Sequence, residues 1–188
     1  PPYVMTDTNN QLYGLEYEII TSALAAVGHT VNGKTMPLAR LVQTFQEGGV
    51  KAAAPILPST NSGGTLSEVY LVYNNIAMGL SSAALKVNSL ADLKNLRIVA
   101  FQTAQKALGP DFAAAVQDNK QYKEEATQIT QIRLLANNRV DVVIGEARIL
   151  NYFLKSPETG VDPKTRVDEF RIFPPTNYRV AFKNAQYA

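Results

Sequence analysis

Residues 40–57 read RLVQTFQEGGVKAAAPIL, and residues 131–148 read QIRLLANNRVDVVIGEAR. Apolar residues recur in both stretches at positions that lie 90 residues apart: Val42 with Ile132, Phe45 with Leu135, and Val50 with Val140. Each stretch predicts an amphipathic helix, a break and a buried strand. Gly48 and Asn138 stand at the two breaks, and both residue types tolerate the left-handed conformation that ends helices.

This repeat of a helix and a strand predicts two similar α/β lobes in one chain. Paired α/β lobes create a cleft, and small ligands bind at domain interfaces and at the carboxyl ends of strands. The length of 188 residues agrees with one domain or with two small ones and does not decide between them.

The composition is that of a folded protein. Apolar residues make up 46% of the chain and charged residues 18%, which is below the roughly 25% of an average globular protein. The net charge is +2, and the basic residues are scattered rather than gathered in a stripe, so we expect no nucleic-acid partner. No apolar run reaches the ~20 residues of a membrane span, and no signal peptide is visible.

The sequence lacks the residues that several kinds of chemistry require. There is no cysteine, which excludes disulfides and thiolate catalysis, and the single histidine, His29, has no second histidine with which to build a usual metal site. Catalytic motifs such as Gly-x-Ser-x-Gly and His-Glu-x-x-His are absent, and so is a phosphate-binding glycine-rich loop. We therefore expect neither an enzyme nor a cofactor or metal.

The remaining pattern alternates helices and strands. In the first part we expect a helix from Tyr17 to Val27, a strand at Thr30–Lys34, a helix after Pro37 and a strand at Val50–Ala54. Strand-like segments at 69–73 and 76–80 would lead into the second lobe, and 178–182 would lead back. Lobe 1 would then comprise residues 1–80 and 177–188, and lobe 2 residues 81–176.

Lobe 2 has an α/β order of its own. We expect strands at 97–101 and 140–144 and a helix capped by Ser89, with further helices at 104–108, at 110–116, around Ile129 to Leu135, and at 147–154. Because strands that alternate with helices pair in parallel, the predicted fold is α/β with a mainly parallel sheet in each lobe.

The order of these segments resembles a known family. The stretches PPY (residues 1–3), GLEYEIITSALAAVG (14–28), PLARLVQTFQEGGV (37–50), SLADLKNLRIVAFQ (89–102) and RVDVV (139–143), the last followed by Gly145 and Glu146, are similar to the bacterial periplasmic solute-binding proteins of the polar amino-acid type. The resemblance covers nearly the whole chain. The family has a further strand before the Pro-Pro-Tyr segment and helices after the position of Ala188, so the chain is expected to be clipped at both ends.

The resemblance implies a type II periplasmic-binding-protein fold, in which two lobes joined by two crossing strands close on a small polar solute. It implies a monomer in the periplasm or outside the cell that delivers an amino acid, or a related amine or acid, to the membrane permease of an ABC transporter. Two alternatives use the same scaffold: a ligand-sensing domain of a signalling or cell-wall protein, and a small-molecule lyase with Glu146 as general acid or base.

The family's ligand loops indicate part of the expected site. In the loop after the first lobe's buried strand, Ser59 and Thr60 match family residues, but the arginine that grips a ligand carboxylate is missing. The site has therefore changed its ligand or lost it. In the second lobe, Gln102 and Thr103 follow the VAF strand, where Thr103 replaces a family glycine and can offer donors together with Gln105.

Three further residues complete the expected site, each with a structural alternative. Glu146 matches the family acid that holds a ligand ammonium, and it also follows a buried strand, at the edge where clefts form; alternatively it caps the helix that begins at Ala147. Tyr3 would form an aromatic wall for the ligand, or pack at a lobe edge. Arg40 lies early in a helix, which the helix dipole disfavours, so an anionic ligand group or a surface acid is its expected partner.

Overall fold

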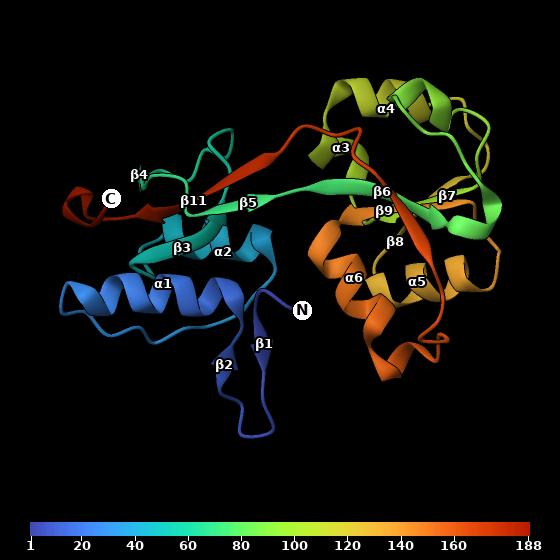
Figure 1. Cartoon of the computed structure of the whole chain (residues 1–188). Coiled ribbons are helices and arrows are strands. Elements are labelled where there is room, and N and C mark those ends of the chain that lie inside the picture. The colour runs from blue at the N-terminus through green and yellow to red at the C-terminus, as the bar shows by residue number, and fades with distance from the viewer. The chain divides into compact units, whose positions relative to one another are not determined.

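The computed structural model describes all 188 residues and divides the chain into two compact units (Figure 1). Unit 1 comprises residues 1–73 and 176–188, and unit 2 comprises residues 74–175. The chain therefore passes twice from one unit to the other. Residues 75–80, which the sequence analysis assigned to lobe 1, belong to unit 2 because they form the strand β6 (Asn75–Leu80), whose two ladder partners both lie there.

Unit 2 contains a five-stranded mixed sheet in the order β10-β6-β9-β7-β8. Its other strands are β7 (Ile98–Phe101), β8 (Tyr122–Glu125), β9 (Val142–Glu146) and β10 (Val167–Phe170). β7 runs parallel to both β8 and β9, whereas β6 is antiparallel to β9 and to β10. The expected parallel sheet is thus present in three strands, and two antiparallel strands extend it.

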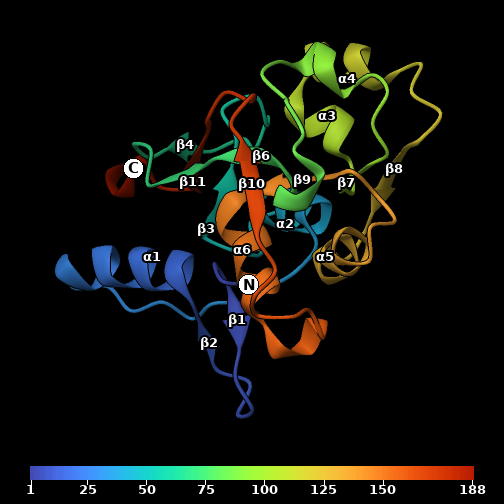
Figure 2. The same cartoon turned by 45° about the vertical axis from the view of Figure 1, so that its right-hand side comes forward.

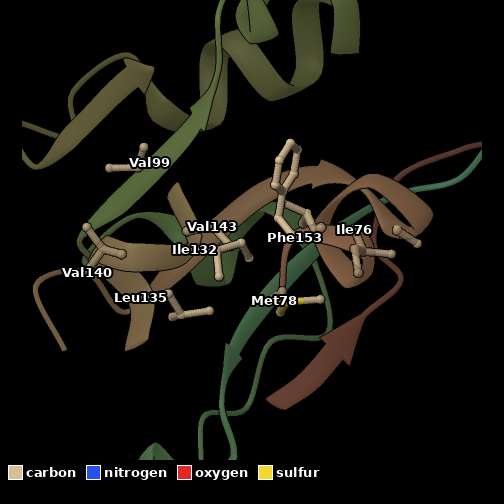
Figure 3. Close-up of a cluster of buried hydrophobic side chains, with 10 residues drawn as sticks. Ile76, Met78, Val99, Ile132, Leu135, Val140, Val143 and Phe153 are labelled. Atoms are coloured by element: carbon tan, nitrogen blue, oxygen red, sulfur yellow. The ribbon is translucent and has the colours of Figure 1, made fainter. Parts of the chain in front are cut away.

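Helices cover both faces of this sheet (Figures 1 and 2). The helices of unit 2 are α3 (Ala104–Leu108), α4 (Pro110–Val116), α5 (Gln128–Ala136) and α6 (Ala147–Lys155), with 3-10 helices η1 (Ser81–Ala83), η2 (Leu90–Leu93) and η3 (Pro157–Thr159). Successive strand residues point to opposite faces. Val99 and Val143 pack in the cluster beneath α5 and α6 (Figure 3), while Ile98 and Val142 pack beneath α3 and α4. The apolar runs of β7 and β9 are therefore buried on both sides.

Unit 1 has a smaller core and no parallel strands. Its elements are β1 (Met5–Thr6), β2 (Leu12–Tyr13), α1 (Leu15–Ala26), α2 (Leu38–Gln46), β3 (Ala52–Ile56), β4 (Thr65–Leu66), β5 (Leu71–Tyr73), β11 (Thr176–Phe182) and the 3-10 helix η4 (Ala185–Tyr187). β11 pairs antiparallel with β3, β4 and β5, and the buried core centres on Phe45, Ala53, Ile56 and Ala181.

The strand expected at Thr30–Lys34 does not form, and this explains why the sheet of unit 1 lacks its parallel pair. The segment runs along α1 instead. Gly33 lies against the ring of Tyr17, where a Cβ atom would come within 2.7 Å of Tyr17 Cε2. Without a second strand from this segment, β3 has only β11 beside it, and the expectation of a mainly parallel sheet was wrong for unit 1.

The sequence repeat is confirmed as a structural repeat of a helix, a turn and a strand. α2 and α5 end in the same way, with Gly48 at φ 82° and Asn138 at φ 54°. In the first copy Gly48 N–H donates to Phe45 O (3.0 Å) and Gly49 N–H to Thr44 O (2.8 Å). In the second, Asn138 and Arg139 donate to Leu135 and Leu134 in the same pattern, which is the Schellman motif.

Strands with polar or very short sequences were not expected. β8 reads YKEE and lies at the edge of its sheet, where charged side chains are tolerated and block pairing with other chains. β1, β2 and β4 each have 2 residues. The expected helix after Ser89 is the 3-10 helix η2, with the Asp92 carboxylate accepting the Ser89 N–H at 2.9 Å.

An ion pair joins β7 to the turn before β9. Arg97 Nη2 lies 2.7 Å from Asp141 Oδ1, and the Arg97 backbone N–H donates to Asp141 Oδ2 at 2.7 Å. The hydrogen bond from the Arg97 side chain is the main cause that lowers the pKa of Asp141, against an opposing effect of burial. A lowered pKa in the folded state stabilises the fold at pH values above the unfolded pKa, and the stabilisation is lost as the pH falls through the folded pKa.

We expect Asp141→Asn to lower the free energy of unfolding by about 1 kcal/mol at neutral pH, a value reduced for the partial exposure of the pair. The difference from wild type should shrink as the pH falls from the unfolded pKa of about 3.9 through the lower folded pKa, because the wild-type carboxyl is then protonated first in the unfolded and then in the folded state. Urea unfolding at several pH values measures both. Asp118→Asn, at an exposed residue, is the control; a pH-independent difference at Asp141 would contradict the expected role of its charge.

Candidate functional site

The carboxyl ends of the parallel strands of unit 2 bring four polar residues to one edge of the sheet. Gln102 and Thr103 follow β7, Glu146 ends β9, and Glu124 lies near the end of β8. The register places Ala100 opposite both Glu124 and Ile144, so the three strands end at the same level. Ligands of open α/β sheets bind at such an edge. The sequence pattern predicts three of these residues here, whereas Glu124 lies in a segment for which no strand was predicted.

Glu124 holds the backbone that follows β7. Its carboxylate accepts the N–H groups of Thr103 (2.6 Å) and Gln105 (3.1 Å) and the hydroxyl of Tyr122 (2.9 Å). Burial acts to raise the pKa of Glu124, but these hydrogen bonds and one from Ala104 outweigh it and lower the pKa. Glu124 therefore stays ionised near neutral pH. The backbone donors that the sequence analysis expected for a ligand at Thr103 and Gln105 are bound to this carboxylate.

Glu146 caps helix α6. One carboxylate oxygen accepts the N–H groups of Arg148 (2.7 Å) and Ile149 (3.1 Å), while the other lies 3.4 Å from the N–H of Asn74 and 3.7 Å from the Arg148 guanidinium. The side chain is almost completely buried, because only 4% of the residue is exposed. These are the contacts of a helix cap, which is the structural alternative given above for Glu146. Its role toward a ligand stays a prediction.

Of the residues expected from lobe 1, Arg40 and Ser59 are exposed, Thr60 is half-buried and Tyr3 is buried. Arg40 is the third residue of α2, and Ser59 and Thr60 lie in the turn that follows β3. The loop after β3 contacts the last residue of α2, because Gln46 Nε2 donates to the carbonyl oxygen of Asn61 at 2.9 Å. Arg40 is exposed and forms no ion pair. The contact of Arg40, Ser59 and Thr60 with a ligand stays a prediction.

Tyr3 is part of an aromatic cluster in unit 1. It is only 4% exposed, and its ring stacks on that of Tyr73 at 4.5 Å, which in turn meets Tyr178 at 4.7 Å. Beside this cluster the Tyr70 hydroxyl donates to Glu16 at 2.6 Å, and burial raises the pKa of Glu16. Tyr3 therefore packs against other aromatic rings, which is its structural alternative. Its contact with a ligand stays a prediction.

A second feature of unit 1 is an apolar groove with a volume of about 530 Å³. α1 forms one wall, mainly through Ile20 and Leu24, and Val69, Val180 and Tyr187 form the other. None of the expected ligand residues lies in this groove. His29 is at its rim, where its ring meets Tyr187 edge-on at 4.8 Å, as part of a surface turn. No group of three or more metal-ligating side chains is present in the structure.

The two-unit α/β architecture, with a mixed sheet in unit 2 and two chain crossings, is the fold of the periplasmic binding proteins. This conclusion comes from comparison with solved structures. No protein-family model matches the sequence, and no curated protein matches it. None of the helices has the length and apolar character needed to cross a membrane.

Among the similar solved structures is an ancestral arginine-binding protein bound to arginine, with a TM-score of 0.72 and 18% identity over 100% of this chain and 84% of that one. A histidine kinase sensor domain with similarity to periplasmic binding proteins has a TM-score of 0.71 and 16% identity over 98% of this chain and 78% of that one. The substrate-binding protein of an amino acid ABC transporter has a TM-score of 0.65 and 16% identity over 99% and 82%. These neighbours are binding proteins and a sensor domain.

Proposed function

We propose that this chain is an extracytoplasmic solute receptor that binds a small polar solute, an amino acid or a related amine or acid, for uptake by an ABC transporter. The observation that carries the proposal is the fold shared with amino-acid-binding proteins over the whole chain. The polar residues at the carboxyl edge of β7, β8 and β9 support it, because ligands of such sheets bind at that edge.

In this proposal the solute is held by residues of both units. Gln102, Thr103 and Glu146 act from unit 2, and the residues that act from unit 1 are Tyr3, Arg40, Ser59 and Thr60. Contacts made only in a closed form would give the solute a higher affinity for that form and shift the population toward it. The receptor works as a monomer in the periplasm or outside the cell, needs no cofactor, and passes the solute to a membrane permease.

A ligand-sensing domain on the same scaffold is the second candidate. The similarity to a histidine kinase sensor domain favours it, because that neighbour matches about as well as the arginine-binding protein. Both candidates bind a solute. Co-purification with a permease complex distinguishes transport from sensing, and so does the domain content of the complete gene product.

Calorimetric titration with amino acids, amines and small organic acids tests the proposal. The protein is first unfolded and refolded to remove any bound molecule. At least one solute should bind with a Kd in the micromolar range or below, and at about 100 times its Kd it should add about 2.7 kcal/mol to the free energy of unfolding. Flat titrations with the whole panel, for a protein with a cooperative thermal transition, would contradict a solute receptor.

A further inference from the structure

A carboxylate of the chain itself occupies the best anion-binding donors at the ligand edge of unit 2. Consecutive backbone N–H groups at the start of a helix bind carboxylates well. Here those of Thr103 and Gln105 donate to Glu124, and the Tyr122 hydroxyl adds a further bond. The Glu124 carboxylate therefore already occupies the N–H donors of the loop after β7.

A solute carboxylate gains little binding free energy at this loop. To reach the N–H groups of Thr103 and Gln105 it must displace Glu124, breaking the same hydrogen bonds that it then makes. If Glu124 stays in place, the incoming carboxylate stands beside a like charge, which is unfavourable. The N–H groups of Arg148 and Ile149 at the start of α6 are bound to Glu146, and the Arg148 guanidinium lies 3.7 Å from the same carboxylate.

A cationic solute group meets favourable charge at the same place. Glu124 is exposed, ionised, and forms no ion pair with any lysine or arginine. The Glu146 carboxylate lies at the end of the same parallel strands, with Arg148 as its cationic neighbour at 3.7 Å. Glu124 is thus an exposed carboxylate without a cationic partner within the protein, whereas the buried Glu146 has Arg148 beside it.

We infer that Glu124 makes this receptor select amines that carry no carboxylate over the corresponding amino acids. The inference rests on the proposed function, because it names the solute class of that site. Specificity of this kind comes from a repulsive element against the wrong ligand together with an attractive one for the right ligand, and Glu124 supplies both.

The direct test compares each amino acid with its decarboxylated counterpart by calorimetry on the refolded full-length chain. L-arginine is paired with agmatine, and L-lysine with cadaverine. We expect the amine of the better-bound pair to bind at least about tenfold more tightly than its amino acid, since a like-charge contact in a partly exposed site costs on the order of one such factor. Equal affinities or a preference for the amino acid would overturn the inference.

Two substitutions locate the effect. Glu124→Gln removes the negative charge and should reduce the preference for the amine by about tenfold, mainly through weaker binding of the amine. Glu125→Gln makes the same change of charge at the next residue, whose side chain points to the opposite face of β8 and accepts a hydrogen bond from Thr127 N–H; it should leave the preference unchanged. Circular dichroism confirms that each variant is folded.

The outcomes separate this inference from the proposed function. If L-arginine or L-lysine binds more tightly than its amine, the chain is still a solute receptor and only the role of Glu124 fails. A preference that survives Glu124→Gln also overturns the role of Glu124. If no amine, amino acid or small acid binds at all, the proposed function fails, and the inference fails with it. Should Glu124→Gln not fold, equal affinities or a preference for the amino acid in the wild-type comparison would still overturn the inference.

Discussion

Gln131→Glu is expected to lower the free energy of unfolding by about 4 kcal/mol at neutral pH, because it places a charge in the core of unit 2 without a partner. Gln131 is 0% exposed, and its Nε2 donates to the carbonyl oxygens of Val99 (3.0 Å) and Ile144 (3.1 Å). Its Oε1 has no hydrogen-bond partner. A carboxylate there faces two carbonyl oxygens and donates nothing to either of them.

The pH dependence gives this prediction a second readout. Burial raises the folded-state pKa of the introduced carboxyl above its unfolded value of about 4.3. The variant is therefore closest to wild type below that pH and loses stability as the pH rises toward the folded pKa. Gln131→Met is the matched control: it loses the two hydrogen bonds without a charge and should cost roughly 1–2 kcal/mol at every pH. Equal losses for the two variants at neutral pH would show that Gln131 is not in a dry core.

Glu146→Ala is expected to lower the free energy of unfolding by about 2 kcal/mol, at the upper end of the range for a helix cap, because the side chain is buried. The substitution leaves the N–H groups of Arg148 and Ile149 without acceptors. Urea unfolding measures the loss. Asn184→Ala is the control, since Asn184 also caps a turn, at Gln186 N–H, but in the exposed last 3-10 helix, where a few tenths of a kcal/mol are expected.

Glu146→Gln separates the cap from the ligand role that the sequence analysis assigned to this residue. An amide oxygen still accepts N–H bonds, so we expect roughly half of the stability loss of the alanine variant. If Glu146 also holds a ligand cation, the affinity for the best amine should fall at least about tenfold in this variant. An unchanged affinity would leave Glu146 as a helix cap only.

The sequence predicted the helices and most of the buried strands well, for a local reason. α3 and α4 begin and end at the expected residues, and α1, α5 and α6 lie within two residues of the expectation. β3 and β9 both begin two residues later than expected, at Ala52 and Val142. The same shift in both copies follows from the shared Schellman turn, which needs the residues after Gly48 and Asn138 before the strand can pair.

The candidate site was predicted in part. The sequence placed Gln102, Thr103 and Glu146 after buried strands, and the structure brings them to one edge because those strands are parallel neighbours. Glu124 was missed because YKEE has no apolar alternation, so β8 could not be distinguished from a loop. A residue in an unrecognised strand cannot be assigned to the edge where that strand ends.

By itself, therefore, the sequence determined the repeated helix and strand units, their turns and their buried faces, since helical spacing, apolar runs and the residues that permit a left-handed turn are all encoded within a few positions. Only the tertiary structure decided which strands pair, that β11 returns antiparallel beside β3, and that Glu124 accepts hydrogen bonds from the N–H groups of Thr103 and Gln105. Those outcomes depend on hydrogen-bond partners about 20 to more than 100 residues apart, and local sequence does not specify which distant partner a backbone group will find.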